Sequence, residues 1–186
     1  PNKIIPYHYD KYAQCPERYE MVTTNCLTGK ACYYEEKNNP QRIIDIVRAS
    51  SSLPFVCPIA YVDGIPMLDG GITDSIPLLR AQNEGFTENN VVVLTRNRGY
   101  RKQIKGTKVP PFIYRKYPLL REAINNRSKL YNEQLDLVER LEDEGRITVI
   151  RPQRPIEVNR IEKNIDKLTA LYEEGYQLAD GIRFEL

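Results

Sequence analysis

The stretch Leu68-Asp69-Gly70-Gly71-Ile72-Thr73-Asp74-Ser75-Ile76-Pro77 decides the fold, because it joins an apolar extended run to the start of a helix. Asp69 ends the extended run, and Gly70 and Gly71 follow it directly. Paired glycines let the backbone turn steeply or pass close to another group. The stretch can therefore hold a carboxylate at the edge of a sheet, where α/β proteins place their sites. The alternative is that Asp69 only starts a turn, as Asp before Gly often does.

The residues after this turn predict a helix over 75–85. Asp74 or Ser75 would be its N-cap, and Pro77 suits its first turn. Gly85 would end it as a C-terminal cap.

On both sides of this stretch, the sequence predicts further strands and helices. Hairpins are predicted over 20–35, turning at Thr28-Gly29, and over 59–68, turning at Asp63-Gly64. Helices are predicted over 40–49, over 118–144 and near the C-terminus. The residues expected to face inward are Ile43, Ile44, Ile46 and Val47 in the first helix, Ile124, Tyr131, Leu135, Val138 and Leu141 in the second, and Ile165, Leu168, Tyr172, Tyr176 and Ala179 in the last.

Two short runs flank the long helix: 91–94, which is entirely apolar, and 147–150, which is apolar except for Thr148. Such runs are typical of strands buried on both faces of a parallel sheet. The fold expected is a single α/β domain over 1–186, with parallel central strands and hairpins at an edge.

Composition excludes several classes of protein. The chain has 186 residues and a net charge of +2, and no apolar run approaches the length of a membrane span. Four cysteines and one histidine, His8, make neither a disulfide framework nor a common zinc set. Cys26 and Cys32 could face each other across the first hairpin, as a disulfide or as small apolar strand residues. We expect a reduced, cytoplasmic protein.

Positive charge is concentrated in one stretch. Arg96–Lys129 contains eleven Lys or Arg and one acid, whereas 133–144 contains six acids and one Arg. The basic stretch could contact an anionic membrane surface, where each cation contributes about 1 kcal/mol. Alternatively, it is a solvated loop whose charge is offset by the acidic helix that follows.

Several segments together resemble the patatin-like phospholipases, and in particular a bacterial branch of patatin-like acyl hydrolases. The segments are 48–54, the hairpin through Asp63-Gly64, 68–71, 92–96, 98–102, 114–118, Tyr131-Asn132 and 149–152. The resemblance covers essentially the whole chain. It implies a three-layer fold with a mainly parallel central sheet.

The resemblance implies a serine–aspartate dyad that hydrolyses acyl esters of lipids. Asp69 matches the aspartate of the family's D-G-G/A motif, which accepts the proton of the nucleophilic serine; Gly70 and Gly71 complete the motif. His8 then needs no catalytic role, and no cofactor or metal ion is expected. The substrate would be a lipid or another acyl ester.

The family's nucleophile lies in a G-x-S-x-G elbow, which this chain does not contain. None of the five serines, Ser50, Ser51, Ser52, Ser75 and Ser128, stands between glycines at that spacing. The glycine-rich oxyanion segment is also missing from the chain. We therefore expect the chain to be the C-terminal portion of a longer enzyme, with nucleophile and oxyanion segment preceding it. Alone, it should be inactive and self-associating.

The sequence leaves two other functions open. One is a non-catalytic module that binds an anionic surface or nucleic acid through 96–129, although the hydrolase interpretation expects no nucleic acid. The other is a magnesium site made by Asp63, Asp69 and Asp74, which is weaker because no phosphate-binding loop accompanies it.

Overall fold

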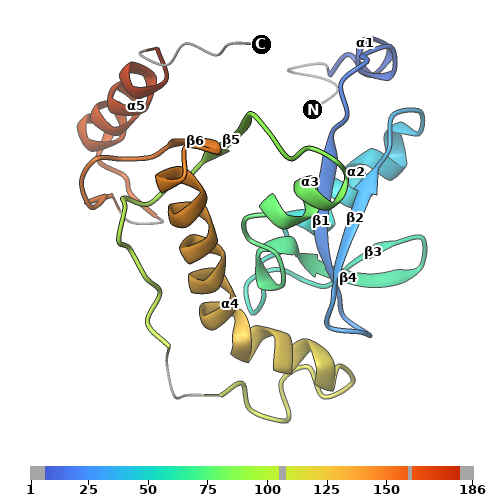
Figure 1. Cartoon of the computed structure of the whole chain (residues 1–186). Coiled ribbons are helices and arrows are strands. Elements are labelled where there is room, and N and C mark those ends of the chain that lie inside the picture. The colour runs from blue at the N-terminus through green and yellow to red at the C-terminus, as the bar shows by residue number, and fades with distance from the viewer. Residues whose placement is uncertain (1–6, 105–107, 159–160, 181–186) are drawn as a thin grey trace. The chain divides into compact units, whose positions relative to one another are not determined.

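A computed structural model describes residues 7–104, 108–158 and 161–180 of the chain (Figure 1). Helices and strands are mixed, and the chain divides into two compact units. The first consists of Pro1–Ile76 and Ile104–Tyr131, and the second of Pro77–Gln103 and Asn132–Leu186. Each unit is described by itself.

The first unit contains a four-stranded sheet with the order β2-β1-β4-β3. Its strands are β1 (Glu20–Asn25), β2 (Ala31–Glu35), β3 (Ala60–Val62) and β4 (Ile65–Asp69). All neighbouring strands are antiparallel. The expectation of a mainly parallel central sheet is therefore wrong, because β1 pairs antiparallel with β4 and so joins the two hairpins into one sheet.

Both predicted hairpins are confirmed. Asp63 and Gly64 have φ of 51° and 76°, as the tight left-handed turn between β3 and β4 requires. Gly29 has φ of 65° in the turn between β1 and β2. Cys26 and Cys32 do not face each other, because Thr23 is the partner of Cys32, and both thiols are free. Burial raises the pKa of the Cys26 thiol to about 12, as expected for an inert apolar side chain.

Helix α2 (Pro40–Ser50) packs against β1, β3 and β4. It begins after Asn39, whose side chain accepts a hydrogen bond from the Arg42 N–H, and Pro40 occupies the first turn. Its buried residues are Ile43, Ile46 and Ala49, whereas Val47, which was expected to be buried, is exposed. Ile46 and Ala49 join Met67 of β4 in one apolar cluster.

The opposite face of β4 packs against the long helix α4 (Pro118–Asp143). Leu68 points away from its neighbour Met67, since side chains alternate along a strand, and it shares a cluster with Ile72 and Leu120. β4 is therefore covered on both faces, although its sheet is antiparallel.

The segment after β4 differs from the helix predicted over 75–85. A 3₁₀ turn, η1 (Gly70–Ile72), comes first, and α3 (Leu78–Asn83) begins only after Pro77. Neither Asp74 nor Ser75 caps α3; their side chains bond to Tyr33 and to the Gly71 carbonyl instead. Gly85 follows the helix with φ of 96°, as predicted for a C-terminal glycine.

In the second unit, β5 (Asn90–Val93) and β6 (Ile147–Ile150) form a two-stranded parallel sheet. Their parallel pairing confirms the prediction for 91–94 and 147–150. The predicted burial on both faces is wrong, because Val92 is buried but Val93 is 70% exposed.

Helix α4 ends as predicted. Leu135, Val138 and Leu141 are buried, and Gly145, with φ of 68°, follows the helix. The Arg146 N–H donates to the Leu141 carbonyl, which closes the end of the helix.

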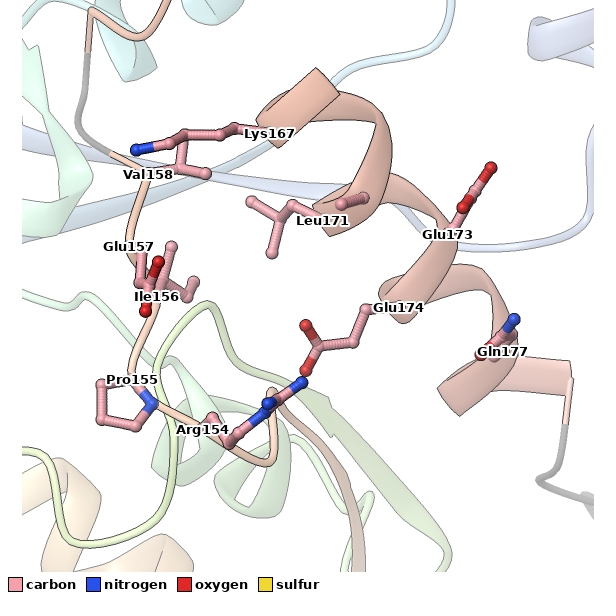
Figure 2. A pocket seen from close by; sticks show the side chains of 11 residues that line it. Arg154, Pro155, Ile156, Glu157, Val158, Lys167, Leu171, Glu173, Glu174 and Gln177 are labelled. Carbon is pink, nitrogen blue, oxygen red and sulfur yellow. The ribbon is translucent and has the colours of Figure 1, made fainter. Parts of the chain in front are cut away.

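Helix α5 (Ile165–Asp180) corrects a second expectation. None of its described residues is buried, and Tyr172 is 70% exposed. Its predicted inward stripe, Ile165, Leu168, Tyr172, Tyr176 and Ala179, is exposed. Figure 2 shows Leu171 and Glu174 of α5 on the side that faces the segment 154–158 across a hollow.

Candidate active site

Asp69 lies at the end of β4, and its backbone is fixed from two sides. Its N–H donates to the Ser52 carbonyl at 2.9 Å. Its own carbonyl accepts a hydrogen bond from Thr24 Oγ1 at 2.8 Å, because Thr24 comes from β1, the strand that pairs with β4. The antiparallel sheet therefore positions the carboxylate that follows.

The Asp69 side chain turns back onto the glycines. Its Oδ1 accepts a hydrogen bond from the Gly71 N–H at 2.7 Å, so that Asp69 caps η1. The side chain is half-buried. Within the described part of the chain, Oδ2 has no hydrogen-bond partner. One oxygen thus anchors the carboxylate, and the other remains available as an acceptor.

Gly70 cannot be replaced without moving the backbone. A Cβ at this position would overlap the Val22 carbonyl group, lying 2.6 Å from its carbon atom. Since Val22 is in β1, the close approach of the turn to this strand requires glycine.

The serine hydroxyls donate to backbone carbonyls rather than to Asp69. Ser50 Oγ bonds to the Val22 carbonyl at 2.8 Å. Ser51, Ser52 and Ser75 each bond to the carbonyl four residues earlier, at 2.9, 2.7 and 2.8 Å. Such local bonds are typical of serine at helix ends. Ser128 lies on α4. In the described residues, no serine hydroxyl is hydrogen-bonded to the Asp69 carboxylate.

The three aspartates considered for magnesium do not gather. Asp63 pairs with Arg42 at 2.8 Å, and the hydrogen bonds from that guanidinium lower the pKa of the Asp63 carboxyl. Asp74 accepts a hydrogen bond from Tyr33 Oη at 2.6 Å. Among the described residues, no three His, Cys, Asp or Glu side chains are placed to hold a metal ion. The geometry therefore gives the magnesium alternative no support.

Two arginines of the basic stretch are paired with acids on the second half of α4. Arg98 lies 2.7 Å from Asp143, and Arg101 lies 2.8 Å from Glu139. Their charges are thus offset by the acidic segment, as one of the two interpretations of this stretch predicts.

Elsewhere in the stretch, Phe112 is 77% exposed and has the exposed cations Lys108, Arg115 and Lys116 near it in sequence.

In the part of the chain that the structure describes, each unit contains a hollow. That of the second unit, about 480 Å³, lies between 154–158 and α5 and is lined by charged groups such as Arg154, Lys167 and Glu174 (Figure 2). That of the first unit, about 700 Å³, has tyrosines and α2 side chains in its lining. Asp69 is not among the residues that line either hollow.

His8 is exposed. None of the described helices is long and apolar enough to cross a membrane.

Reasoning from the sequence missed two residues that hold the Asp69 turn. They are Thr24, which bonds to the Asp69 carbonyl, and Arg127 of α4, whose Nε donates to the Gly71 carbonyl at 2.6 Å. Arg127 is 56 residues from Gly71, and no local spacing signals their contact.

Two family models match the chain. The model of the patatin-like phospholipases matches residues 28–81, and a model described as a domain of unknown function (DUF6363) matches residues 117–182. No curated protein matches the chain significantly. The patatin-like match includes the strands of the second hairpin and the turn Asp69-Gly70-Gly71. It supports the patatin resemblance of this segment and points to a family of lipid acyl hydrolases.

Proposed function

We propose that the chain is the C-terminal portion, over 1–186, of a patatin-like catalytic domain that hydrolyses acyl esters of lipids, with Asp69 as the proton acceptor of a serine–aspartate dyad. One observation carries the proposal. The Asp69 carboxylate lies in the segment that matches the patatin-like model, with Oδ1 held by Gly71 and Oδ2 without a partner in the described residues.

In this mechanism, the nucleophilic serine comes from the chain that precedes Pro1. Its Oγ attacks the ester carbonyl while its proton passes to Asp69, and the alcohol then leaves with that proton, which gives an acyl-enzyme. Water, deprotonated by the same carboxylate, releases the fatty acid and regenerates the serine. The hydrogen bond from Gly71 keeps the carboxylate oriented through both steps. The mechanism uses no cofactor.

The first test is the coding sequence upstream of Pro1, which should contain an in-frame G-x-S-x-G elbow. The second is Asp69→Asn in the complete protein, assayed with a chromogenic short-chain ester. Asparagine keeps an oxygen that accepts from the Gly71 N–H, so the turn should persist while the proton acceptor is lost. We expect kcat to fall by about 10²–10⁴, the usual scale for loss of a general base. An unchanged kcat would contradict the assignment.

The exposed loop around Phe112 supports contact with a membrane as part of this function. An exposed aromatic ring with Lys108, Arg115 and Lys116 near it suits the interface of an anionic bilayer. The complete protein should sediment with vesicles that contain anionic lipid and less with neutral ones. Phe112→Ala combined with Lys116→Gln should weaken this binding; binding that is equal with both vesicle types would contradict membrane contact through this loop.

A further inference from the structure

Gly71 is the centre of a small hydrogen-bond network at the candidate site. Its N–H holds Asp69 Oδ1 at 2.7 Å. Its carbonyl accepts from Ser75 Oγ at 2.8 Å and from Arg127 Nε at 2.6 Å. The same peptide segment therefore connects the carboxylate to a hydroxyl and a guanidinium.

The three side chains also converge in space. A Cβ built on Gly71 would lie 3.0 Å from Asp69 Oδ1, 3.5 Å from Ser75 Oγ and 3.5 Å from Arg127 Nη2. Carboxylate, hydroxyl and guanidinium thus lie around one point next to the Gly71 Cα.

Arg127 reaches this point because the first half of α4 is anchored beside the turn. Leu120 is fully buried with Leu68 and Ile72, the residues that flank Asp69-Gly70-Gly71. Arg127 follows Leu120 by seven residues, about two helical turns, and so lies on the same face of α4. A Cβ on Gly29 would lie 2.5 Å from the Leu119 carbonyl oxygen, which shows how closely the β1–β2 turn approaches the start of the helix.

We propose that Arg127 is a positioning residue for Asp69. The first half of α4 lies at the beginning of the segment that matches the domain of unknown function, and through Arg127 it contributes to the activity of the patatin-like site. This inference rests on the proposed function. A guanidinium fixes a carbonyl more firmly than a neutral donor, because the hydrogen bond is charge-assisted and the group is planar. Arg127 holds the peptide group that follows Gly71, and this restrains the Gly71 Cα and, through it, the preceding peptide group whose N–H holds the carboxylate.

The test compares Arg127→Gln and Arg127→Lys with a matched control in the complete protein. The control is Arg140→Gln, which removes the same charge from an exposed side chain on the second half of α4. Two quantities are measured: hydrogen exchange of the Gly71 amide, and the kinetics of ester hydrolysis. The Cys26 amide, bonded to the Pro66 carbonyl at 2.9 Å, reports whether the sheet remains folded.

For Arg127→Gln we expect the Gly71 amide to exchange at least about 10-fold faster, with the Cys26 amide unchanged. We expect kcat to fall by about 10–100-fold with KM within about twofold, since displacement of a catalytic group has effects of this size. Arg127→Lys, which can still donate to the carbonyl, should recover part of both losses. Arg140→Gln should change neither quantity.

Unchanged Gly71 exchange and unchanged kcat in Arg127→Gln would overturn the inference. So would equal acceleration at Gly71 and Cys26 in both Arg127 variants, because Arg127 would then stabilise the fold in general. Failure of the proposed function would give a different result from failure of this inference. If Asp69 is not the base, Asp69→Asn would leave kcat unchanged. Hydrogen exchange of the Gly71 amide would still show whether Arg127 holds the turn.

Discussion

The hydroxyl of Thr24 lies 2.8 Å from the Asp69 carbonyl oxygen and 2.8 Å from Thr73 Oγ1. Thr24 is fully buried in β1, so it connects the start of the Asp-Gly-Gly turn to the end of η1 from inside the sheet. Thr24→Val keeps the shape of the side chain and removes both hydrogen bonds. We expect the free energy of unfolding to fall by about 1–3 kcal/mol, because the part-buried Asp69 carbonyl loses a donor and Thr73 Oγ1 loses a partner.

Chemical denaturation of wild type and variant measures this change. Thr28→Val, in the exposed turn between β1 and β2, is the control and should have a small effect. Equal stability of Thr24→Val and wild type would show that Thr24 does not hold the turn.

Asp74 and Asp63 should affect stability rather than catalysis, in contrast to Asp69. Asp74 accepts a 2.6 Å hydrogen bond from Tyr33 Oη, which ties the residue after η1 to β2. Tyr33→Phe removes this donor and should lower the free energy of unfolding by about 1–2 kcal/mol. Asp63→Asn weakens an exposed pair with Arg42, and asparagine tolerates the left-handed backbone of that turn, so its effect should be smaller.

Thermal melts and ester kinetics on the same variants separate the two roles. Both variants should retain a kcat close to that of wild type in the complete protein. A kcat lost in Asp63→Asn or Asp74→Asn but kept in Asp69→Asn would place the base elsewhere.

The elements that the sequence predicted well are those with local signals. Asp63-Gly64 between apolar runs specifies a tight turn, Asn39 and Pro40 specify the start of α2, and Gly145 specifies the end of α4. The position of Asp69 before two glycines predicted a turn that holds its carboxylate, whereas the role of proton acceptor came only from the resemblance to the patatin-like phospholipases.

The antiparallel arrangement of the four-stranded sheet could not be predicted from local signals of this kind. It depends on the pairing of Thr23 with Asp69, residues 46 positions apart in the chain, and no local pattern encodes that register. The apolar stripe of α5 shows a related limit. Spacing identifies an amphipathic face, but only tertiary contacts decide whether that face is covered, and Tyr172 remains exposed.

The open face of the two-stranded sheet should make the isolated chain self-associate. Val91 and Val93 of β5 are both exposed and alternate with buried Val92, so one face of this strand presents apolar side chains to solvent. We expect light scattering of purified 1–186 to show a mass that rises with concentration. Val93→Lys should lower this association, and Thr148→Lys, on the already polar position of β6, should lower it less. A monomer at all concentrations for the unmodified chain would contradict the prediction.

Glu139 should make the second unit sensitive to acid. Its carboxylate accepts hydrogen bonds from Arg101 at 2.8 Å and from the Gly99 N–H at 3.0 Å, and Arg151 lies 3.7 Å away. The hydrogen bond from Arg101, together with the other contacts, lowers the pKa of the Glu139 carboxyl from 4.5 to about 2. A carboxyl whose pKa is lower in the folded state stabilises that state fully above its unfolded pKa and loses this contribution as pH falls through the folded pKa. The stabilisation by Glu139 is therefore complete above about pH 4.5 and disappears as pH approaches 2.

Melting temperatures of wild type and Glu139→Gln, measured from pH 7 down to pH 2, test this prediction. We expect the wild type to melt at the higher temperature at pH 7, with a difference that is constant down to about pH 4.5 and shrinks between pH 4.5 and 2. Glu144→Gln is the control, because its partner Arg146 lies 3.3 Å away in an exposed pair, and such pairs contribute little. A difference for Glu139→Gln that stays the same over the whole range would mean that the carboxylate is not held by Arg101 in solution.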